Sequence, residues 1–144
     1  MSAGVSIEDS RWLADLAGLS DVESITPMEG GWDNSNNLLK LTDGGLFVLK
    51  IWHAQMNLTC VDAVIYRQIH VERNGIPTSV PIQLTDGERY AVRDGVAWTL
   101  LPYVEGGHLS SDPVALESLG ETMARMHEIP LVDYYPRDYR MGSV

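Results

Sequence analysis

Three aspartate–glycine pairs constrain the fold of this chain more than any other feature of its sequence. They are Asp43-Gly44, Asp86-Gly87 and Asp94-Gly95. Asp-Gly readily supplies the positive φ angles of tight hairpins, so each pair predicts two antiparallel neighbouring strands. The sequence therefore predicts an antiparallel five-stranded sheet, with strand regions at Val22–Glu29, Asn37–Thr42, Leu46–Trp52, Pro81–Leu84 with Arg89–Val92, and Val96–Tyr103.

One helix interrupts the expected strands between the third and the fourth region. Apolar residues recur at helical spacing from Leu58 to Ile69. The pattern stops at Asn74-Gly75, with Pro77 just beyond, which is typical of a helix C-terminus. We expect an α+β fold with a single amphipathic helix inserted into the sheet.

Two more helices are expected at the ends of the sheet region. Ser6, with Asp9 three residues later, predicts a short capped helix that ends before Gly18. Asp112-Pro113 is a favourable start for another helix, which runs to Glu128. The apolar stripe of this last helix consists of Leu116, Leu119, Met123 and Met126. We expect the stripe to be exposed, because no later element of the chain is predicted to cover it.

Composition excludes several classes of function. The formal net charge of −10 at pH 7 argues against a binder of nucleic acid or of an anionic membrane, because both require a basic face. No apolar run approaches the roughly 20 residues that span a bilayer. A single cysteine, Cys60, permits no internal disulfide, and the four histidines do not follow a zinc-binding spacing. We expect a cytoplasmic globular protein.

Lys50 is the one charged residue in the apolar run from Leu46 to Trp52. The period of two along a strand places its side chain on the same face as Val48 and Trp52. A dry, unpaired ammonium group is costly, which leaves two interpretations. In one, Lys50 lies near a sheet edge and extends to water. In the other, it binds a phosphate, and a carboxylate of the inserted helix holds it in position.

The loop before this hairpin favours the phosphate interpretation. Gly30-Gly31 allows close approach of the backbone to a ligand, and short donors follow at Asn34, Ser35, Asn36 and Asn37. Glycine and asparagine are also ordinary turn residues, so turn formation alone is the alternative. The loop matches neither GxGxxG nor GxxxxGK[ST].

Taken in order, these features resemble the aminoglycoside phosphotransferase and choline/homoserine kinase superfamily, which has the kinase-like fold. The matching segments are GGWDNSNNLLKL with DGGLFVLKIW, NGIPTSVPIQLTDGERYAV, WTLLPYVEGGHL and LGETMARMHEIP. The resemblance implies a nucleotide-binding N-lobe over residues 1–107, including the N-terminal helix and the hinge. Residues 108–144 would then begin a helical C-lobe that is truncated.

The resemblance also implies roles for individual residues in binding ATP. Lys50 would hold the α- and β-phosphates, and Ser35, between Asn34 and Asn36, would lie over them. The connector from Leu101 to Val104 would bind the adenine edge through its backbone, with Tyr103 near the base. A plain core aromatic is the alternative role for Tyr103.

The sequence departs from this family in two respects. The carboxylate expected to pair with Lys50 has only one candidate near the expected place, Asp62, for which an exposed helix charge is the alternative. The His-x-Asp loop and the magnesium-binding aspartate are absent. His127 is expected to be a packing residue, and Asp133 and Asp138 stand outside any such motif. We therefore expect Mg²⁺ only together with a missing C-lobe.

Two hypotheses of different classes follow. The first is an ATP-dependent O-phosphotransferase of small hydroxyl compounds, represented by its nucleotide-binding lobe and inactive alone. Its substrate would be bound through the missing lobe. The second is a non-catalytic α+β interaction domain. Under either hypothesis, the apolar face of the last helix could be covered by self-association or by a separately encoded C-terminal half.

Overall fold

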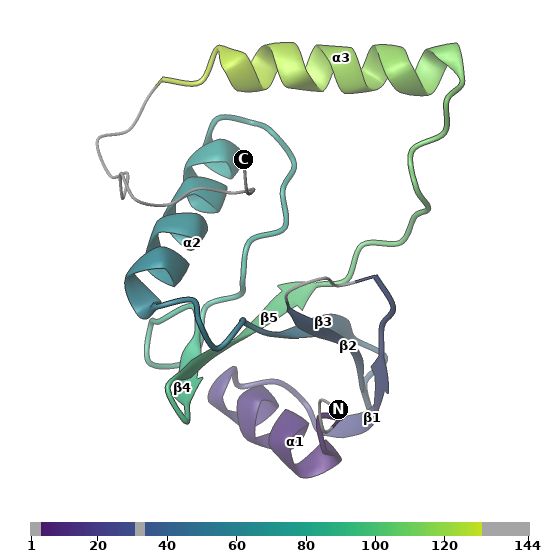
Figure 1. The fold of residues 1–144 in the computed structure, drawn as a ribbon. Coiled ribbons are helices and arrows are strands. Elements are labelled where there is room, and N and C mark those ends of the chain that lie inside the picture. Colours follow the sequence, from purple (N-terminus) through teal and green to yellow (C-terminus); the bar gives the residue numbers. More distant parts are fainter. Residues whose placement is uncertain (1–3, 31–33, 131–144) are drawn as a thin grey trace.

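Five antiparallel strands form one sheet, as the sequence predicts, and their order in the sheet is β1-β2-β3-β5-β4 (Figure 1). The computed structural model describes residues 4–30 and 34–130. The strands are β1 (Val22–Pro27), β2 (Ser35–Leu41), β3 (Leu46–Ile51), β4 (Ala91–Arg93) and β5 (Val96–Pro102). The predicted hairpins at Asp43-Gly44 and Asp94-Gly95 join β2 to β3 and β4 to β5. At the second of these, both Asp94 and Gly95 have positive φ, at 51° and 76°.

The segment Pro81–Leu84 is not a strand, which corrects the prediction made from its sequence. It runs beside β5, and the Ile82 amide donates to the Leu100 carbonyl at 2.8 Å. Pro81 has no N–H group, so this residue cannot donate to a ladder of hydrogen bonds. The turn at Asp86-Gly87 still forms, with the Gly87 amide donating to the Leu84 carbonyl at 3.0 Å, and the short β4 follows it.

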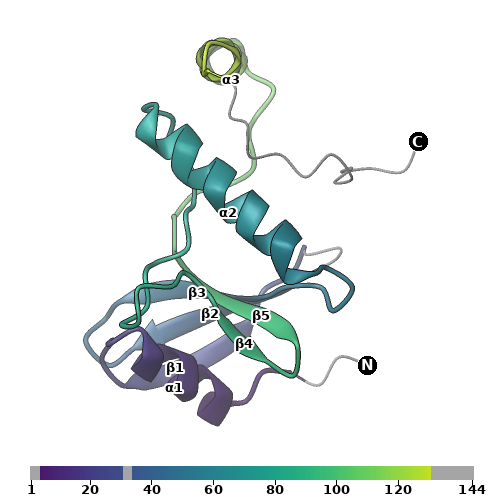
Figure 2. The ribbon, with the colours of Figure 1, turned by 90° about the vertical axis from the view of Figure 1, so that its left-hand side faces the viewer.

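Two helices cover opposite faces of the sheet (Figure 2). Helix α1 (Ile7–Leu16) begins with the capping box of Ser6 and Asp9. Helix α2 (Leu58–Arg73) is the inserted helix, and Asn57 caps it by accepting a hydrogen bond from the Cys60 amide at 2.9 Å. The short polar side chains at both caps satisfy backbone donors that a helix leaves unpaired.

Each face of the sheet has its own apolar core. The larger core packs β-strand residues against α1, and its buried members are Leu13, Ala14, Val22, Leu39, Leu41, Leu49, Leu84 and Leu100. The smaller core lies beneath α2 and contains Trp52, Val61, Ile65 and Ala97. Alternation along β3 assigns Leu49 to the first core and Trp52 to the second. Lys50 therefore lies on the α2 face of the sheet.

Helix α3 (Pro113–His127) is separated from the sheet by a long connector (Figure 1). None of its residues is buried. Its end contacts the end of α2, where Arg125 Nη2 donates to the Gly75 carbonyl at 2.5 Å. The predicted stripe is exposed, with relative exposures of 50% at Leu116, 41% at Leu119, 49% at Met123 and 46% at Met126. No helix in the described ranges is long and apolar enough to cross a membrane.

Candidate functional site

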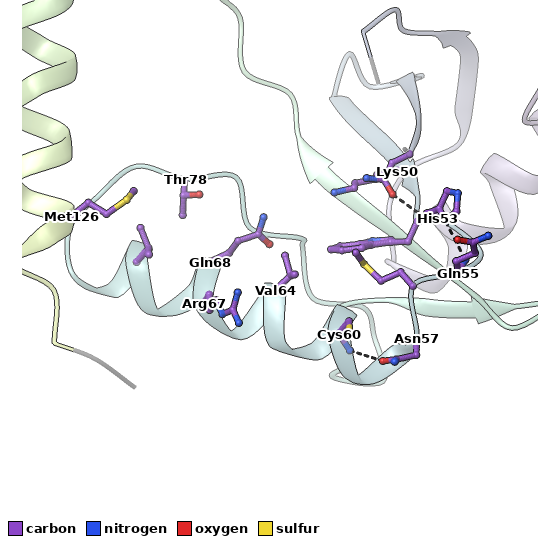
Figure 3. A pocket seen from close by; sticks show the side chains of 14 residues that line it. Lys50, His53, Gln55, Asn57, Cys60, Val64, Arg67, Gln68, Thr78 and Met126 are labelled. Carbon is purple, nitrogen blue, oxygen red and sulfur yellow. Dashed lines mark hydrogen bonds between the residues drawn. The ribbon is translucent and has the colours of Figure 1, made fainter. Parts of the chain in front are cut away.

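A pocket of about 730 Å³ lies between the α2 face of β3 and the helix itself (Figure 3). Strand β3 and the loop after it form one wall, and α2 forms the other. The end of α3 contributes a single residue. The lining residues are Asn34, Lys50, Trp52, His53, Gln55, Met56, Asn57, Cys60, Val64, Arg67, Gln68, Val71, Thr78 and Met126.

The charge of this pocket is opposite to that of the whole chain. The sequence contains 20 acidic residues and has a net charge of −10. None of the lining residues is an aspartate or glutamate, whereas Lys50 and Arg67 are both cations. Lys50 has no carboxylate within ion-pair distance among the described residues, so its half-buried charge favours an anionic ligand.

Lys50 is held between two other strands rather than at an edge. Strand β3 lies between β2 and β5, and the residues directly opposite Lys50 are Asn36 and Thr99. This position contradicts the interpretation in which Lys50 lies near a sheet edge. Burial lowers the pKa of Lys50 below its usual range. Among the described residues, no carboxylate oxygen lies within ion-pair distance of the ammonium group.

The interaction that the ammonium group does make is with an aromatic ring. Lys50 Nζ lies 4.0 Å from the centroid of the Trp52 ring. Within about 6 Å, the electron-rich face of a tryptophan attracts a cation. Sequence analysis placed Lys50 and Trp52 on one face of the strand but did not assign Trp52 a role in the site.

Two of the three loop residues expected over a phosphate, Asn34 and Asn36, lie on the side of Lys50. Asn34 lines the pocket, and its Oδ1 accepts a hydrogen bond from the His53 amide at 2.9 Å. Ser35 opens β2 directly opposite Ile51, so its side chain lies on the α1 face of the sheet, where its Oγ accepts from Asn37 Nδ2 at 3.3 Å. It does not line the pocket. Asn36 is directly opposite Lys50. Residue Gly31 of the expected glycine pair lies outside the described residues.

Asp62 does not pair with Lys50 in this structure. Its side chain is exposed and does not line the pocket. The α2 residues that do line it include Val64 and Gln68, four residues apart. Asp62 precedes Val64 by two residues, which is a rotation of about 200° around the helix, so it faces away. The carboxylate that the sequence suggested is therefore on the wrong side of α2.

Gln68 is a polar residue of α2 that lines the pocket together with Lys50. Its side chain and that of Lys50 extend into the pocket from opposite walls (Figure 3). Gln68 Oε1 is buried and has no hydrogen-bond partner in the described part of the chain. Helical spacing from Val64 identifies Gln68 as a residue on the same side of α2. Only carboxylates were considered as partners for Lys50 in the sequence analysis, which therefore missed Gln68.

The connector residues lie outside this pocket. Leu101 is half-buried in β5 opposite Val48, and therefore on the same face of the sheet as Lys50. The Tyr103 amide donates to the Leu46 carbonyl at 3.3 Å, so this N–H group is not available to a ligand. Val104 is 76% exposed.

A second row of residues lies next to Lys50 on the same face. Val48 is directly opposite Leu38 on one side and Leu101 on the other. Residues directly opposite each other in antiparallel strands share a face, and all three are only half-buried. They form an apolar surface between the connector and the neighbouring row of opposite residues, which consists of Asn36, Lys50 and Thr99.

The described residues do not fit a magnesium site. They contain no group of three or more His, Cys, Asp or Glu residues that could hold a metal ion. Mg²⁺ is bound through carboxylates and phosphates, and the pocket lining supplies no carboxylate.

Comparison with known proteins identifies the family and the fold. A family model described as the phosphotransferase enzyme family matches residues 24–142. A spectinomycin phosphotransferase solved with ADP and spectinomycin aligns with a TM-score of 0.71 at 14% identity, over 90% of this chain and 40% of its own.

An amicoumacin kinase solved with AMP-PNP and Ca²⁺ aligns with a TM-score of 0.63 at 17% identity, over 94% of this chain and 41% of its own. No curated protein sequence matches this chain. The alignments confirm the kinase-like fold, and the chain spans about two fifths of the length of these structures.

Proposed function

This chain belongs to the phosphotransferase enzyme family, and from that premise we propose that it is the nucleotide-binding part of an ATP-dependent O-phosphotransferase. Residues 1–107 would form the nucleotide-binding lobe, and residues 108–144 would begin the helical lobe. The observation that carries the proposal is the half-buried Lys50 in a pocket whose lining contains no carboxylate, in a chain of net charge −10. A polyphosphate is the ligand that such a pocket favours.

The phosphates would lie against Lys50. Its ammonium group has no competing carboxylate, so a phosphate oxygen would be its anionic partner. Asn34 has an amide NH₂ that no described residue occupies, and Asn36 faces the same side as Lys50. Ser35 lies between them, but its side chain faces α1, so it would have to turn to reach a phosphate. These short donors support a cradle at the start of β2.

The base would lie on the apolar row of Leu38, Val48 and Leu101. Backbone groups beyond this row point alternately toward β3 and away from it. The Tyr103 amide points toward β3, where it bonds Leu46, and the Leu100 carbonyl points away, where it accepts from Ile82. By the same alternation, the Pro102 carbonyl and the Val104 amide point away from β3.

This pair of backbone groups favours adenine over guanine. The Pro102 carbonyl is an acceptor, and no described residue accepts from the Val104 amide. Adenine presents a donor at N6 beside an acceptor at N1, whereas guanine presents an acceptor beside a donor. Pro102 therefore joins Leu101, Tyr103 and Val104 as a proposed base-binding residue, and the structure supports ATP as the nucleotide.

The rest of the reaction requires groups that the described residues do not supply. Asp133 and Asp138 lie outside the described residues. We expect Mg²⁺ and the acceptor hydroxyl to be bound by a C-terminal lobe of the kind that completes the longer solved relatives. The acceptor would be a small hydroxyl compound, as spectinomycin is for the phosphotransferase of similar fold. Such an enzyme consumes ATP and would work in the cytoplasm.

Calorimetric titration with MgATP tests this proposal. The chain contains only two lysines, Lys40 and Lys50, so the first provides a matched control. Lys40 is exposed and pairs with Glu23 at 3.0 Å, away from the pocket. We expect saturable binding that Lys50→Met weakens by about 10- to 100-fold, as for loss of a hydrogen bond to a charged group. Lys40→Met should leave the affinity unchanged.

A second candidate function is a non-catalytic interaction domain, and the exposed apolar stripe of α3 favours it. The stripe could be covered by a C-terminal half or by a second copy. A domain of this kind would tolerate Lys50→Met and would not bind MgATP. A folded, monodisperse parent protein that fails to bind MgATP would support this candidate and overturn the first.

A further inference from the structure

We propose that Trp52 and Thr99 form a positioning unit for Lys50, in which the indole ring holds the ammonium group and Thr99 fixes the ring. The inference rests on the proposed function for its role in phosphate binding. The unit itself is defined by contacts within the protein. It takes the place that a carboxylate would otherwise fill beside a half-buried lysine.

The first contact is between the cation and the ring. Trp52 directly follows the last residue of β3 and lies two residues after Lys50 in extended backbone, so their side chains are neighbours on one face. The distance from Nζ to the ring centroid is 4.0 Å. Trp52 is only 4% exposed, which keeps water away from the ring and strengthens the attraction.

The second set of contacts fixes the ring. Trp52 Nε1 donates to Thr99 Oγ1 at 3.1 Å, and Thr99 Oγ1 donates to the Lys50 carbonyl at 3.3 Å. The Trp52 backbone amide also donates to the Ala97 carbonyl at 3.0 Å. Thr99 is 1% exposed, so a rotated indole would leave buried polar groups unpaired. The three residues form a closed loop of contacts that begins and ends at Lys50.

The chemical consequence concerns the charge that remains for a ligand. A carboxylate beside Lys50 would orient the ammonium group but would cancel its charge. The indole orients it through the ring quadrupole and carries no net charge, so the pocket stays positive. A phosphate can then bind Lys50 without displacing an acid.

Thr99 gives the sharpest test, because it is buried directly opposite Lys50 in β5 and does not line the pocket. Thr99→Val removes the hydroxyl and preserves the shape, whereas Thr99→Ser preserves the hydroxyl. Trp52→Leu removes the ring itself. Ala14→Gly weakens the opposite face of the sheet and serves as a control for lost stability alone.

The first readout is the pKa of Lys50. It is measured by NMR during a pH titration of protein that is labelled at the lysine side chains. Only Lys40 and Lys50 contribute signals, so Lys40 is an internal reference. We expect the pKa of Lys50 to fall further in both Trp52→Leu and Thr99→Val. The first variant removes the ring that stabilises the charged form, and the second removes the hydrogen bond that holds the ring in place. Thr99→Ser should restore the parent value, and Ala14→Gly should not change it.

The second readout is the affinity for MgATP. We expect Thr99→Val and Trp52→Leu to weaken binding by about 3- to 30-fold, the range of a partly buried cation–π contact. If the parent does not bind MgATP, the proposed function fails, and the Lys50 pKa alone decides the inference. An unchanged or raised pKa in both variants overturns it. A lowered pKa that Thr99→Ser restores supports it.

Discussion

Arg93, the last residue of β4, ties helix α1 to the sheet through Trp12. Its guanidinium carbon lies 4.9 Å from the Trp12 ring centroid, and its Nη1 donates to Asp9 Oδ1 at 2.7 Å. Trp12 in turn meets Trp98 of β5 edge to face, with the ring centroids 5.6 Å apart. The first turn of α1 is therefore fixed to two strands that lie far from it in the sequence.

Removing the guanidinium should weaken this attachment. We expect Arg93→Ala to lower the free energy of unfolding by about 1–2 kcal/mol, because it removes partly exposed cation–π contacts with Trp12 and Trp98 and one charge-assisted hydrogen bond. The corresponding fall in Tm is roughly 2–8 °C. Thermal unfolding monitored by circular dichroism measures it. Arg93→Lys should recover part of the loss, and a Tm within about 1 °C of the parent in Arg93→Ala would show that the contacts contribute little.

Lys50 should reduce the stability of the fold at neutral pH. Its pKa is lowered by burial, so the folded state binds its proton less tightly than the unfolded state does. Stability is therefore lowest while Lys50 is charged, and it rises as the pH increases through the lowered pKa toward the ordinary value near 10.5. Lys50→Met removes this penalty, and we expect a gain of about 1 kcal/mol, or roughly 2–4 °C in Tm.

The control for this prediction is the pH dependence. The advantage of Lys50→Met should be full at pH 7 and should shrink at alkaline pH, as the parent lysine loses its proton. Urea unfolding of both proteins between pH 7 and pH 10.5 measures the difference. A parent protein that is more stable than Lys50→Met at pH 7 would contradict the argument, because the cation would then be well compensated.

Periodicity and turn chemistry were sufficient to predict most of the fold. The Asp94-Gly95 turn and the stop at Asn74-Gly75 depend on local backbone preferences, which a sequence displays directly. Pro81–Leu84 was assigned wrongly because its apolar residues satisfy the pattern of a strand. Its place beside β5 depends on a tertiary hydrogen bond from Ile82 to Leu100 that no local pattern shows.

The site was harder to predict than the fold. Lys50 was identified because a cation in an apolar strand is visible in the sequence. Which side of α2 faces Lys50 depends on how the helix packs on the sheet. That packing determines whether Asp62 or Gln68 lines the pocket with Lys50. The contact of Trp52 with Lys50 and with Thr99 of a distant strand requires the sheet register, which sequence analysis did not assign.

Gln68 offers a direct test of which α2 residue faces Lys50. We expect Gln68→Glu to raise the pKa of Lys50, because an ionised carboxylate across the pocket favours the charged ammonium group. It should also weaken MgATP binding by about 3- to 10-fold, since the pocket would lose net positive charge. NMR of the labelled lysines and calorimetry measure the two effects.

Asp62→Asn is the matched control for this variant. Asp62 is exposed on the opposite side of the helix, so its neutralisation should leave both the pKa of Lys50 and the MgATP affinity unchanged. A fall of the Lys50 pKa in Asp62→Asn, together with no change in Gln68→Glu, would show that α2 docks in another rotation.

The stripe of α3 should tolerate charge if nothing in this chain covers it. Leu119 and Met123 are 41% and 49% exposed, and α3 buries none of its residues among those described. We expect Leu119→Glu and Met123→Glu to change the free energy of unfolding by no more than about 0.5 kcal/mol each. Leu49→Ala in the core under α1 should instead cost about 2–5 kcal/mol. Chemical denaturation, with sedimentation to measure the oligomeric state, gives both quantities. Losses above 1 kcal/mol for the α3 variants, accompanied by dissociation of an oligomer, would show that a second copy covers the stripe.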